Sequence, residues 1–428
     1  MGMTMSEKIL ARAAGREQVR PGDLLLARVD FAMGHDLTIP PAGRVMREQM
    51  GAEKVWDPER VAITQDHFQP AKDAASATLG RLTREFAHDM GIKYYFEVGQ
   101  GGICHTVLPE KGLVLPGELV VGAYSHSCTY GALNNFATGI GSTDLACVFS
   151  LGELWFRVPE TLKFVYHNRL SEWVESKDLI LHVIGTIGVD GARSKAMEHT
   201  GEALKHIDME GRLTMTNMAI EAGAKNGIME CDEVTEEYLK GRAKREYTPV
   251  SSDPDAQYER VFEFDAEKVE ITLAKPMSPD NMATISEVAG TRLDQVFVGS
   301  CTNSRITDLR KVAAVLKGRR VAPGLRMIIT PSSEEVARMA EREGLIGVFM
   351  DAGAAWTAST CGACLGGHMG VLGEGEVCLS TTNRNFPGRM GDPKALVYLA
   401  NPTVAAASAV AGEIIHPREV MSREPVGV

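Results

Sequence analysis

The chain has 428 residues, of which 44% are hydrophobic and 24% charged, a balance typical of a globular protein with more than one domain. Lys and Arg total 45 against 56 Asp and Glu, so the formal net charge is −11. This charge argues against nucleic acid or an anionic membrane as a partner, because both select basic surfaces.

No apolar run is long enough to span a bilayer, and residues 1–15 lack the apolar core of a secretory signal, so we expect a cytoplasmic protein without a membrane partner. These first residues instead predict a helix with Ser6 at its N-cap. Eight cysteines are spread through the chain, too sparsely for a disulfide scaffold. In a reducing compartment, metal binding is the stronger hypothesis for them.

Short apolar runs in the first third of the chain end in glycine-rich turns that carry His, Asp or Ser, as in residues 24–43, 91–105 and 117–144. In open α/β sheets, ligand-binding groups gather in the loops at the carboxyl ends of the strands. Several such turns within the first 150 residues make this edge a candidate ligand site.

The second half of the chain predicts further strands and helices. Residues 177–188 predict a buried strand, and residues 191–207 predict helix. Residues 246–290 are rich in Pro, Ser and Asp, which indicates a linker with one or two edge strands. Strand and helix then alternate over QVFVGS, ITDLRKVAAVLKG, LRMIITPSS and EEVARMAEREG, which predicts a parallel sheet, with Ser332 or Ser333 capping the last helix.

Three cysteines stand out. Cys301 directly follows the strand QVFVGS, and Cys361 and Cys364 form a C-x-x-C turn. The turn could be unligated, and a thioredoxin-type pair fits poorly because two glycines follow it and Cys301 stays unused. A zinc site that adds His368 is stereochemically possible. An iron–sulfur cluster held by three thiolates would leave one iron open to water or a substrate oxygen, as a Lewis acid.

Several motifs resemble, in order, the signatures of the aconitase superfamily: QDHFQP, GQGGICHTVLPEKG, VVGAYSHSCTYGALNNFATGIGSTD, TNMAIEAGAKNG, GSCTNSR, STCGACLGG and TTNRNFPGRMG. Each motif alone is moderately specific. The ordered set covers nearly the whole chain and is very specific. Within the superfamily, the chain is most similar to the large subunits of 3-isopropylmalate dehydratase and homoaconitase.

The resemblance implies an α/β fold of three α/β/α domains around a central iron–sulfur cluster, over residues 1–160, 161–285 and 286–428, the last with the cluster cysteines. Single-chain aconitases carry a mobile fourth domain with the serine that abstracts the substrate proton. Only about forty residues follow TTNRNFPGRMG, too few for that domain. The resemblance therefore implies a separate small subunit that carries the swivelling fourth domain, without which this chain is an incomplete enzyme.

The resemblance also implies the site. One [4Fe-4S] cluster per large subunit would be held by Cys301, Cys361 and Cys364, with one iron not ligated by protein. The implied acid–base and hydroxyl-handling residues are Asp66, His67, His105, Ser125, His126 and Glu221. The implied substrate-binding residues are Asn217, Asn303, Asn383, Arg384 and Arg389, and the two arginines suit a hydroxy di- or tricarboxylic acid because guanidinium binds carboxylate with two parallel hydrogen bonds. Glu221 lies four residues after Asn217, which predicts one helix face for both.

The expected reaction is the interconversion of 2- and 3-isopropylmalate by dehydration and rehydration. Homoaconitase and 2,3-dimethylmalate dehydratase are alternatives, and a non-catalytic, metal-stabilised binding protein is a further one. One residue departs from the family pattern: Tyr124 stands before Ser125 and His126 where the family has Asp. A tyrosine hydroxyl can hydrogen-bond an imidazole but brings no negative charge, so we expect a weaker base or a different substrate.

Overall fold

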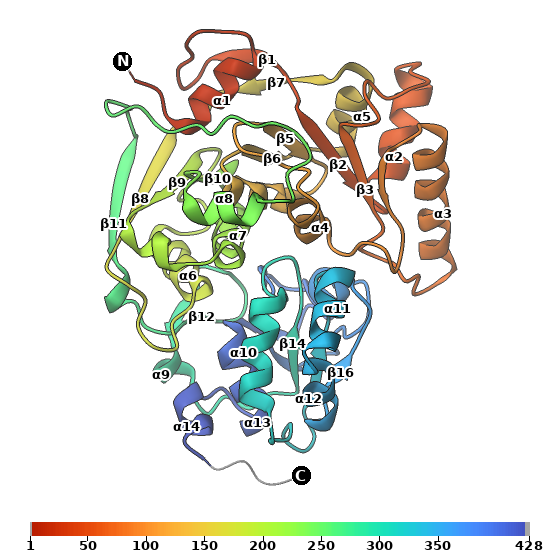
Figure 1. Ribbon diagram of the computed structural model, residues 1–428. Helices are drawn as coiled ribbons and strands as arrows, with labels where there is room; N and C mark the ends of the chain where they lie inside the picture. The colour runs from red at the N-terminus through yellow and green to blue at the C-terminus, as the bar shows by residue number, and fades with distance from the viewer. Residues whose placement is uncertain (1, 424–428) are drawn as a thin grey trace.

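The first sheet lies in the N-terminal part of the structure, a computed structural model that describes residues 2–423 (Figure 1). Its strands are β2 (Phe31–His35), β3 (Val61–Thr64), β4 (Tyr94–Phe96), β5 (Leu119–Gly122) and β6 (Phe136–Gly139). They are all parallel, in the order β4-β3-β2-β5-β6. Every residue of β2, β3 and β5 is buried, as expected for a parallel sheet covered on both faces. The loops after these three strands therefore leave at one edge.

Helices and a short ribbon surround this sheet. The helices are α1 (Met5–Ala13), α2 (Ile39–Arg44), the π-helix η1 (Val45–Gln49), α3 (Ala74–Asp89), α4 (Cys104–Glu110), the 3₁₀-helix η2 (Ser125–Leu133) and α5 (Ser142–Leu151). The ribbon pairs β1 (Leu24–Arg28) with β7 (Glu153–Arg157) antiparallel. The prediction of Ser6 as the first N-cap is wrong. Thr4 is the cap, because its hydroxyl accepts the N–H of Glu7 while the Glu7 carboxylate accepts the N–H of Thr4.

The second sheet is parallel, in the order β10-β9-β8-β11. Its strands are β8 (Thr161–His167), β9 (Ala196–Thr200), β10 (Asn226–Met229) and β11 (Arg260–Asp265). The helices of this part are α6 (Ser176–Ile187), the 3₁₀-helices η3 (Glu202–His206), η4 (Met218–Ala222) and η5 (Ala266–Lys268), α7 (Met209–Asn217) and α8 (Glu233–Leu239).

Two predictions for this part of the chain are wrong. All but the last of residues 177–188 lie in α6 rather than in a strand, because a short run that is mostly apolar and buried reads alike in both states. Residues 191–207 hold β9 and η3 rather than a helix. The buried carboxylate of Glu198 in β9 accepts hydrogen bonds from the hydroxyls of Ser252 and Tyr258, a tertiary contact that overrides local helix propensity.

The third sheet has the order β13-β12-β18-β17-β14-β15-β16 and is parallel except at β12, which pairs antiparallel with β13 and β18. Its strands are β12 (Thr272–Ala274), β13 (Met282–Thr284), β14 (Gln295–Val298), β15 (Arg326–Ile329), β16 (Ala355–Trp356), β17 (Val377–Ser380) and β18 (Leu396–Leu399). The accompanying helices are α9 (Ile285–Val288), α10 (Ile306–Leu316), α11 (Glu334–Arg342), α12 (Leu345–Asp351), the 3₁₀-helix η6 (Gly362–Leu365), α13 (Pro402–Ala411) and α14 (Pro417–Met421).

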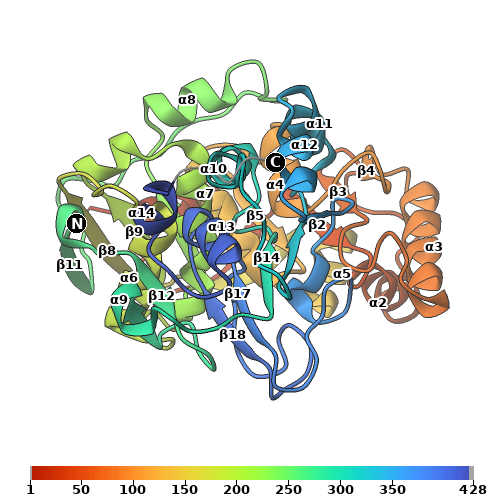
Figure 2. The same cartoon turned by 90° about the horizontal axis from the view of Figure 1, so that it is seen from below.

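The predicted alternation after the linker is confirmed by β14, α10, β15 and α11, and Ser333 caps α11. The linker holds more strand than expected, since β11 and β13 are edge strands but β12 lies inside the sheet. The third sheet and its helices lie below the first two sheets in Figure 1, and Figure 2 places β14, β17 and β18 between the first sheet on one side and the second on the other. Loops of all three sheets can therefore meet at one place.

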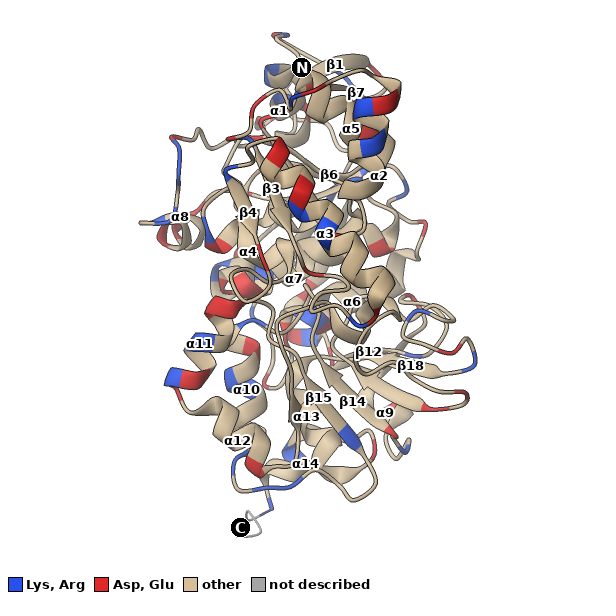
Figure 3. Cartoon of the chain, turned by 90° about the vertical axis from the view of Figure 1, so that its right-hand side faces the viewer, with Lys and Arg blue, Asp and Glu red and all other residues tan. Residues whose placement is uncertain are grey.

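Figure 3 shows acidic and basic segments interspersed along the helices of both the upper and the lower part. Within residues 2–423, every helix is too short or too polar to cross a membrane. Both observations agree with the absence of long apolar runs and basic stripes in the sequence.

A buried histidine in the second sheet predicts acid sensitivity. His199 of β9 is fully buried, its Nδ1 lies 2.9 Å from the Tyr166 hydroxyl, and burial lowers its pKa to about 3. The unfolded chain therefore binds a proton that the folded chain does not, and stability falls as the pH drops from 6.5 toward 3. Between pH 6.5 and 5, the free energy of unfolding of the wild type should fall by about 2 kcal/mol more than that of His199→Gln. Urea denaturation at each pH measures this difference. His88→Gln, on a side chain that is 90% exposed, should leave the pH dependence unchanged.

Candidate active site

The three predicted metal-binding cysteines lie in two loops at one edge of the third sheet. Cys301 follows β14, and its neighbour Ser300 has a φ of 89°, a strained conformation for a residue other than glycine. Cys361 and Cys364 enclose Gly362, whose φ of 57° also lies in the left-handed region. All three cysteine side chains are 1% exposed. The backbone is thus bent at both loops so that the thiols point inward.

Polar groups surround the three sulfur atoms. The side-chain amide of Asn217 donates to the Cys301 Sγ at 3.2 Å, and that of Asn383 donates to the same sulfur at 3.5 Å. The Arg389 Nη2 lies 3.8 Å from the Cys364 Sγ. Hydrogen bonds to sulfur stabilise anionic thiolates and tune iron–sulfur centres. The surroundings therefore suit thiolates that carry charge.

A single zinc ion fits these thiols poorly. Zn–S bonds of about 2.3 Å would hold the sulfur atoms roughly 4 Å apart. Among residues 2–423, the one group of metal-ligating side chains whose donor atoms all lie within 4.8 Å of one another belongs to the first sheet and contains no cysteine. His368, the fourth zinc ligand considered, instead binds the carbonyl of Pro70 through Nε2 at 2.7 Å. Three buried thiols with hydrogen-bond donors directed at sulfur are compatible with a multi-iron cluster.

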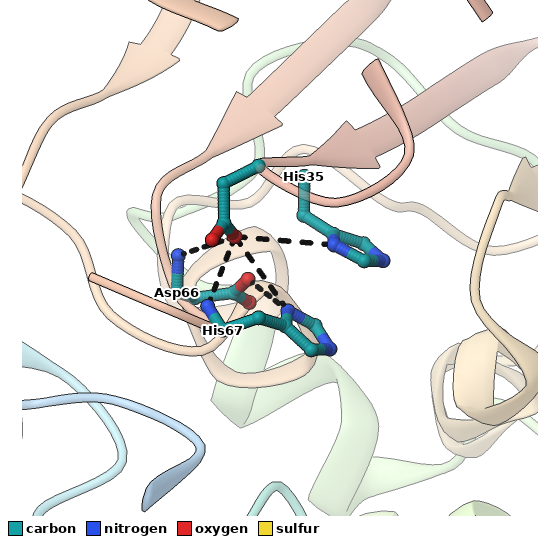
Figure 4. A group of neighbouring side chains, drawn as sticks. His35, Asp66 and His67 are labelled. Carbon is teal, nitrogen blue, oxygen red and sulfur yellow. Dashed lines mark hydrogen bonds and ion pairs between the residues drawn. The ribbon is translucent and has the colours of Figure 1, made fainter. Parts of the chain in front are cut away.

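A carboxylate–imidazole cluster occupies the turns after β2 and β3 (Figure 4). The Nδ1 of His67 lies 2.6 Å from Asp66, and the other Asp66 oxygen accepts the N–H of Cys104. Asp36 accepts the backbone N–H groups of residues 66 to 68. The ring of His35 stacks on that of His67 with centroids 3.8 Å apart. Figure 4 shows the second ring nitrogen of each histidine pointing away from both carboxylates.

The charges in this cluster are divided between the two rings. Burial opposes a charge on His67, but attraction to Asp66 and Asp36 outweighs it and raises the pKa of His67. Burial and the neighbouring His67 lower the pKa of His35 to about 3. Burial alone would raise the pKa of Asp66, yet its interactions with His67 lower it. His67 is therefore a protonated imidazole held by carboxylates, and His35 is neutral.

His105 lies in the first turn of α4, where no carboxylate touches it. Its Nδ1 is 2.9 Å from the Tyr130 hydroxyl, and its Nε2 is buried without a hydrogen-bond partner among the described residues. The ring of Tyr124 lies parallel to it with centroids 4.6 Å apart. Burial and the nearby His126 hold the pKa of His105 well below its usual value. His105 is therefore neutral and has a free ring nitrogen.

Glu221 joins the first part of the molecule to the third. Its carboxylate accepts a hydrogen bond from the Nε2 of His126 at 2.6 Å and from the Nε of Arg384 at 2.8 and 2.9 Å. The Nδ1 of His126 lies 3.5 Å from the Ser125 hydroxyl. A carboxylate only accepts, so the proton of the neutral His126 lies on Nε2. Burial and the two arginines, Arg384 and Arg389, hold the pKa of His126 well below its usual value.

The expected shared helix face of Asn217 and Glu221 needs correction. Asn217 ends α7, whereas Glu221 lies in the following 3₁₀-helix η4, and both side chains are buried rather than solvated. Asn303, the remaining predicted substrate ligand, lies in the loop after β14, two residues after Cys301. It accepts from the buried Lys177 Nζ at 3.3 Å and donates to Asp308, so its contacts position the loop after β14.

A cavity of about 720 Å³ opens beside this cluster. Ser125 and Ile220, the neighbours of His126 and Glu221, are among its lining residues. The lining carries both signs of charge: Arg157, Arg193, Lys195 and Lys225 together with Asp144 and Glu160. Lys195 is paired with Glu160 and Glu259.

The structure brings nearly all of the predicted site residues together from three sheets. Asp66, His67, His105, Ser125 and His126 come from the first sheet, Asn217 and Glu221 from the second, and Asn383, Arg384, Arg389 and the three cysteines from the third. The sequence analysis missed the buried pair His35–Asp36. The segment FAMGHD carried the same signal, since it is an apolar strand followed by His and Asp. Tyr130 and Lys177 had no comparable signal.

Comparisons with known proteins agree with this geometry. A family model described as "Aconitase family (aconitate hydratase)" matches residues 7–292 and 286–412. The chain is 54% identical over 426 residues to the 3-isopropylmalate dehydratase large subunit of Sulfurihydrogenibium sp. (strain YO3AOP1), covering 100% of this chain and 99% of that protein. It is 57% identical over 422 residues to the 3-isopropylmalate dehydratase large subunit 1 of Pyrococcus furiosus, covering 98% and 99%. The holo-form crystal structure of Thermococcus kodakaraensis aconitase X is similar in fold, with a TM-score of 0.50, 13% identity and 84% of each chain covered.

Proposed function

The chain belongs to the aconitase family, and we propose that it is the cluster-bearing large subunit of a 3-isopropylmalate dehydratase. The relatives that share more than half of its residues over the full length carry that name. The observation that carries the proposal most directly is the meeting of three buried cysteines with histidine–carboxylate pairs and two arginines. Dehydration of a hydroxy acid needs each of these groups.

The cofactor we infer is a [4Fe-4S] cluster held by Cys301, Cys361 and Cys364, with one iron not ligated by protein. When bound, it would supply a Lewis acid that polarises the substrate hydroxyl. The hydrogen bonds from Asn217 and Asn383 to sulfur support this inference. The domain boundaries we propose are residues 1–160, 161–285 and 286–428.

The chain's own residues divide the remaining tasks. His67 is protonated, its Nδ1 is occupied by Asp66, and its Nε2 can give a proton to the leaving hydroxide. The Nε of Arg384 binds Glu221, which leaves its outer nitrogens for a substrate carboxylate. Arg389 lies beside Cys364 and can hold a second carboxylate close to the cluster. Glu221 and Ser125 keep His126 in one tautomer.

The base that removes the substrate α-proton is missing from this set, and we infer that a small subunit with a swivelling fourth domain supplies it. "Large subunit" in the names of the relatives implies such a partner. All eight cysteines are free, which favours a reducing compartment, and we infer the cytoplasm.

An isomerase assay of the reconstituted large subunit with its cognate small subunit tests the proposal. We expect 2- and 3-isopropylmalate to interconvert, and homocitrate, citrate and 2,3-dimethylmalate to react more slowly. A complex that carries a full cluster but dehydrates none of these acids would refute an enzymatic function. Preference for homocitrate or 2,3-dimethylmalate would keep the hydro-lyase class and replace the substrate.

Arg389 is expected to bind a substrate carboxylate through its planar fork. Arg389→Lys should raise KM about 10- to 100-fold with a smaller change in kcat, because an ammonium group cannot make two parallel hydrogen bonds. The measurement is steady-state kinetics of the complex at matched iron content. Arg310→Lys is the matched control, since Arg310 makes a two-point contact with Glu343 outside the site. An unchanged KM in Arg389→Lys would remove Arg389 from the carboxylate site.

A further inference from the structure

Tyr124 occupies the centre of the candidate active site. Its ring lies parallel to His105 at 4.6 Å and meets three other histidine rings edge-on, at 4.8 Å from His67, 5.3 Å from His35 and 5.4 Å from His126. The site histidines thus share one neighbour. No other aromatic ring among the described residues touches all four.

The same ring also reaches the cysteines. Tyr124 packs against a small apolar cluster made by Ile103, Cys301 and Cys361, with Leu365 on its rim. The side chain is only partly buried, whereas the histidines around it are buried. Tyr124 therefore lies between the cysteines and the site histidines, where the proposed function places the bound hydroxy acid.

The backbone of Tyr124 is fixed independently of its side chain. Its carbonyl accepts both the N–H and the hydroxyl of Ser127, at 3.0 and 2.7 Å, which holds the start of the 3₁₀-helix η2. The phenolic hydroxyl, in contrast, has no hydrogen bond to any residue in the described part of the chain. A polar group placed among charged and hydrogen-bonding side chains without a partner is suited to a ligand.

We propose that Tyr124 is a substrate-contacting residue whose hydroxyl hydrogen-bonds an oxygen of the bound hydroxy acid, while its ring holds His105 in place by stacking. The inference rests on the proposed function and adds a residue to the substrate site. Among the described residues, His105 has the Tyr130 hydroxyl and the stacked Tyr124 ring as neighbours and no carboxylate hydrogen-bonded to its imidazole. Tyr124 thereby separates two tasks, since its oxygen recognises the substrate and its ring positions a histidine.

Tyr124→Phe tests the hydroxyl alone, because it keeps the ring and its stacking. In the holo-complex we expect the Kd of the hydroxy acid that the wild type turns over to rise about 10- to 100-fold, the loss typical of one hydrogen bond to a charged ligand. The substrate-induced change in the electron paramagnetic resonance spectrum of the reduced cluster should be lost at concentrations that saturate the wild type. Iron content and thermal stability should stay unchanged.

Tyr166→Phe is the matched control. The Tyr166 hydroxyl lies 2.9 Å from the Nδ1 of His199, outside the site, so its loss should leave the Kd and the spectrum unaltered. Tyr124→Leu removes the ring as well, and it should lower kcat further than Tyr124→Phe because His105 loses its stacked neighbour.

Three results would overturn the inference. Equal affinity and an equal spectral response in Tyr124→Phe and the wild type would show that the hydroxyl has no ligand. A loss of iron in Tyr124→Phe would make the residue a structural support of the cysteine loops. Equal kcat in the Phe and Leu variants would remove the positioning of His105. A wild-type complex that binds the acid without turnover would refute the proposed reaction and leave the binding role of Tyr124 standing.

Discussion

Glu221→Gln is expected to lower kcat about a thousandfold, within the range typical of losing a positioned acid–base partner. The carboxylate serves two groups at once, His126 at 2.6 Å and the Arg384 Nε at 2.8 Å. The amide of Gln has a single acceptor oxygen. Its NH₂ group is a donor and would face the N–H of either His126 or Arg384, which is also a donor. Arg384 would then lose its anchor, and His126 would be free to change tautomer. Both changes, at Arg384 and at His126, affect groups beside the substrate, so kcat should fall more than KM rises.

The measurement is single-turnover kinetics of the complex, with iron content and secondary structure verified first. A matched control exists on the surface, where His167 pairs with Glu263, which is 71% exposed. Glu263→Gln makes the same chemical change in the same type of pair and should keep full activity. A Glu221→Gln enzyme within threefold of the wild type would mean that His126 and Arg384 act without their shared carboxylate.

The sheet edge that carries the site was predictable because parallel strands place their following residues at one edge. Gly122 of β5 is followed by Tyr124, Ser125 and His126, and Thr64 of β3 is followed by Asp66 and His67. Each run is buried over its whole length, because both faces of the sheet are covered. The turn residues could therefore be placed together before any contact was known.

Other features depend on contacts that a local pattern does not encode. The strand predicted at residues 177–188 is helix α6, since a short, mostly apolar run does not separate the two states by its periodicity. Lys177 at the start of α6 is fully buried and donates to the carbonyls of Thr381 and Thr382, more than two hundred residues away. In the sequence it is an ordinary charged residue at the edge of an apolar run.

The role of Tyr124 shows the same limit at the site itself. The motif resemblance identified it as a departure from aspartate and predicted a weaker base. The structure adds that the ring contacts four histidines, so the change affects packing across the whole cluster as well as the charge near one imidazole. Because Tyr124 contacts four histidines, the residue at this position and the surrounding histidines must be compatible with one another.

Cys301→Ala is expected to abolish both the cluster and the reaction. With three thiolates holding a cluster, loss of one leaves two, and a buried site with two ligands cannot retain a cubane. We expect bound iron to fall from about four atoms to below about one per chain, and turnover to drop below about a thousandth of the wild-type value. Iron and acid-labile sulfide analysis after anaerobic reconstitution measures the first effect without reference to activity.

Cys378→Ala is the control that separates this loss from simple destabilisation. Cys378 lies in β17 of the same sheet, is fully buried, and pairs in register with Gln295, at the opposite end of β14 from the Cys301 loop. Its replacement removes the same atoms and should cost about 1 kcal/mol of stability while iron and turnover persist.

Retention of four irons in Cys301→Ala would require another donor for the third position. Cys104 is a nearby thiol, since its N–H binds the Asp66 carboxylate and the Asp66 carbonyl accepts the N–H of Cys361. Combining Cys301→Ala with Cys104→Ala would then decide between a substitute ligand and a different metal centre.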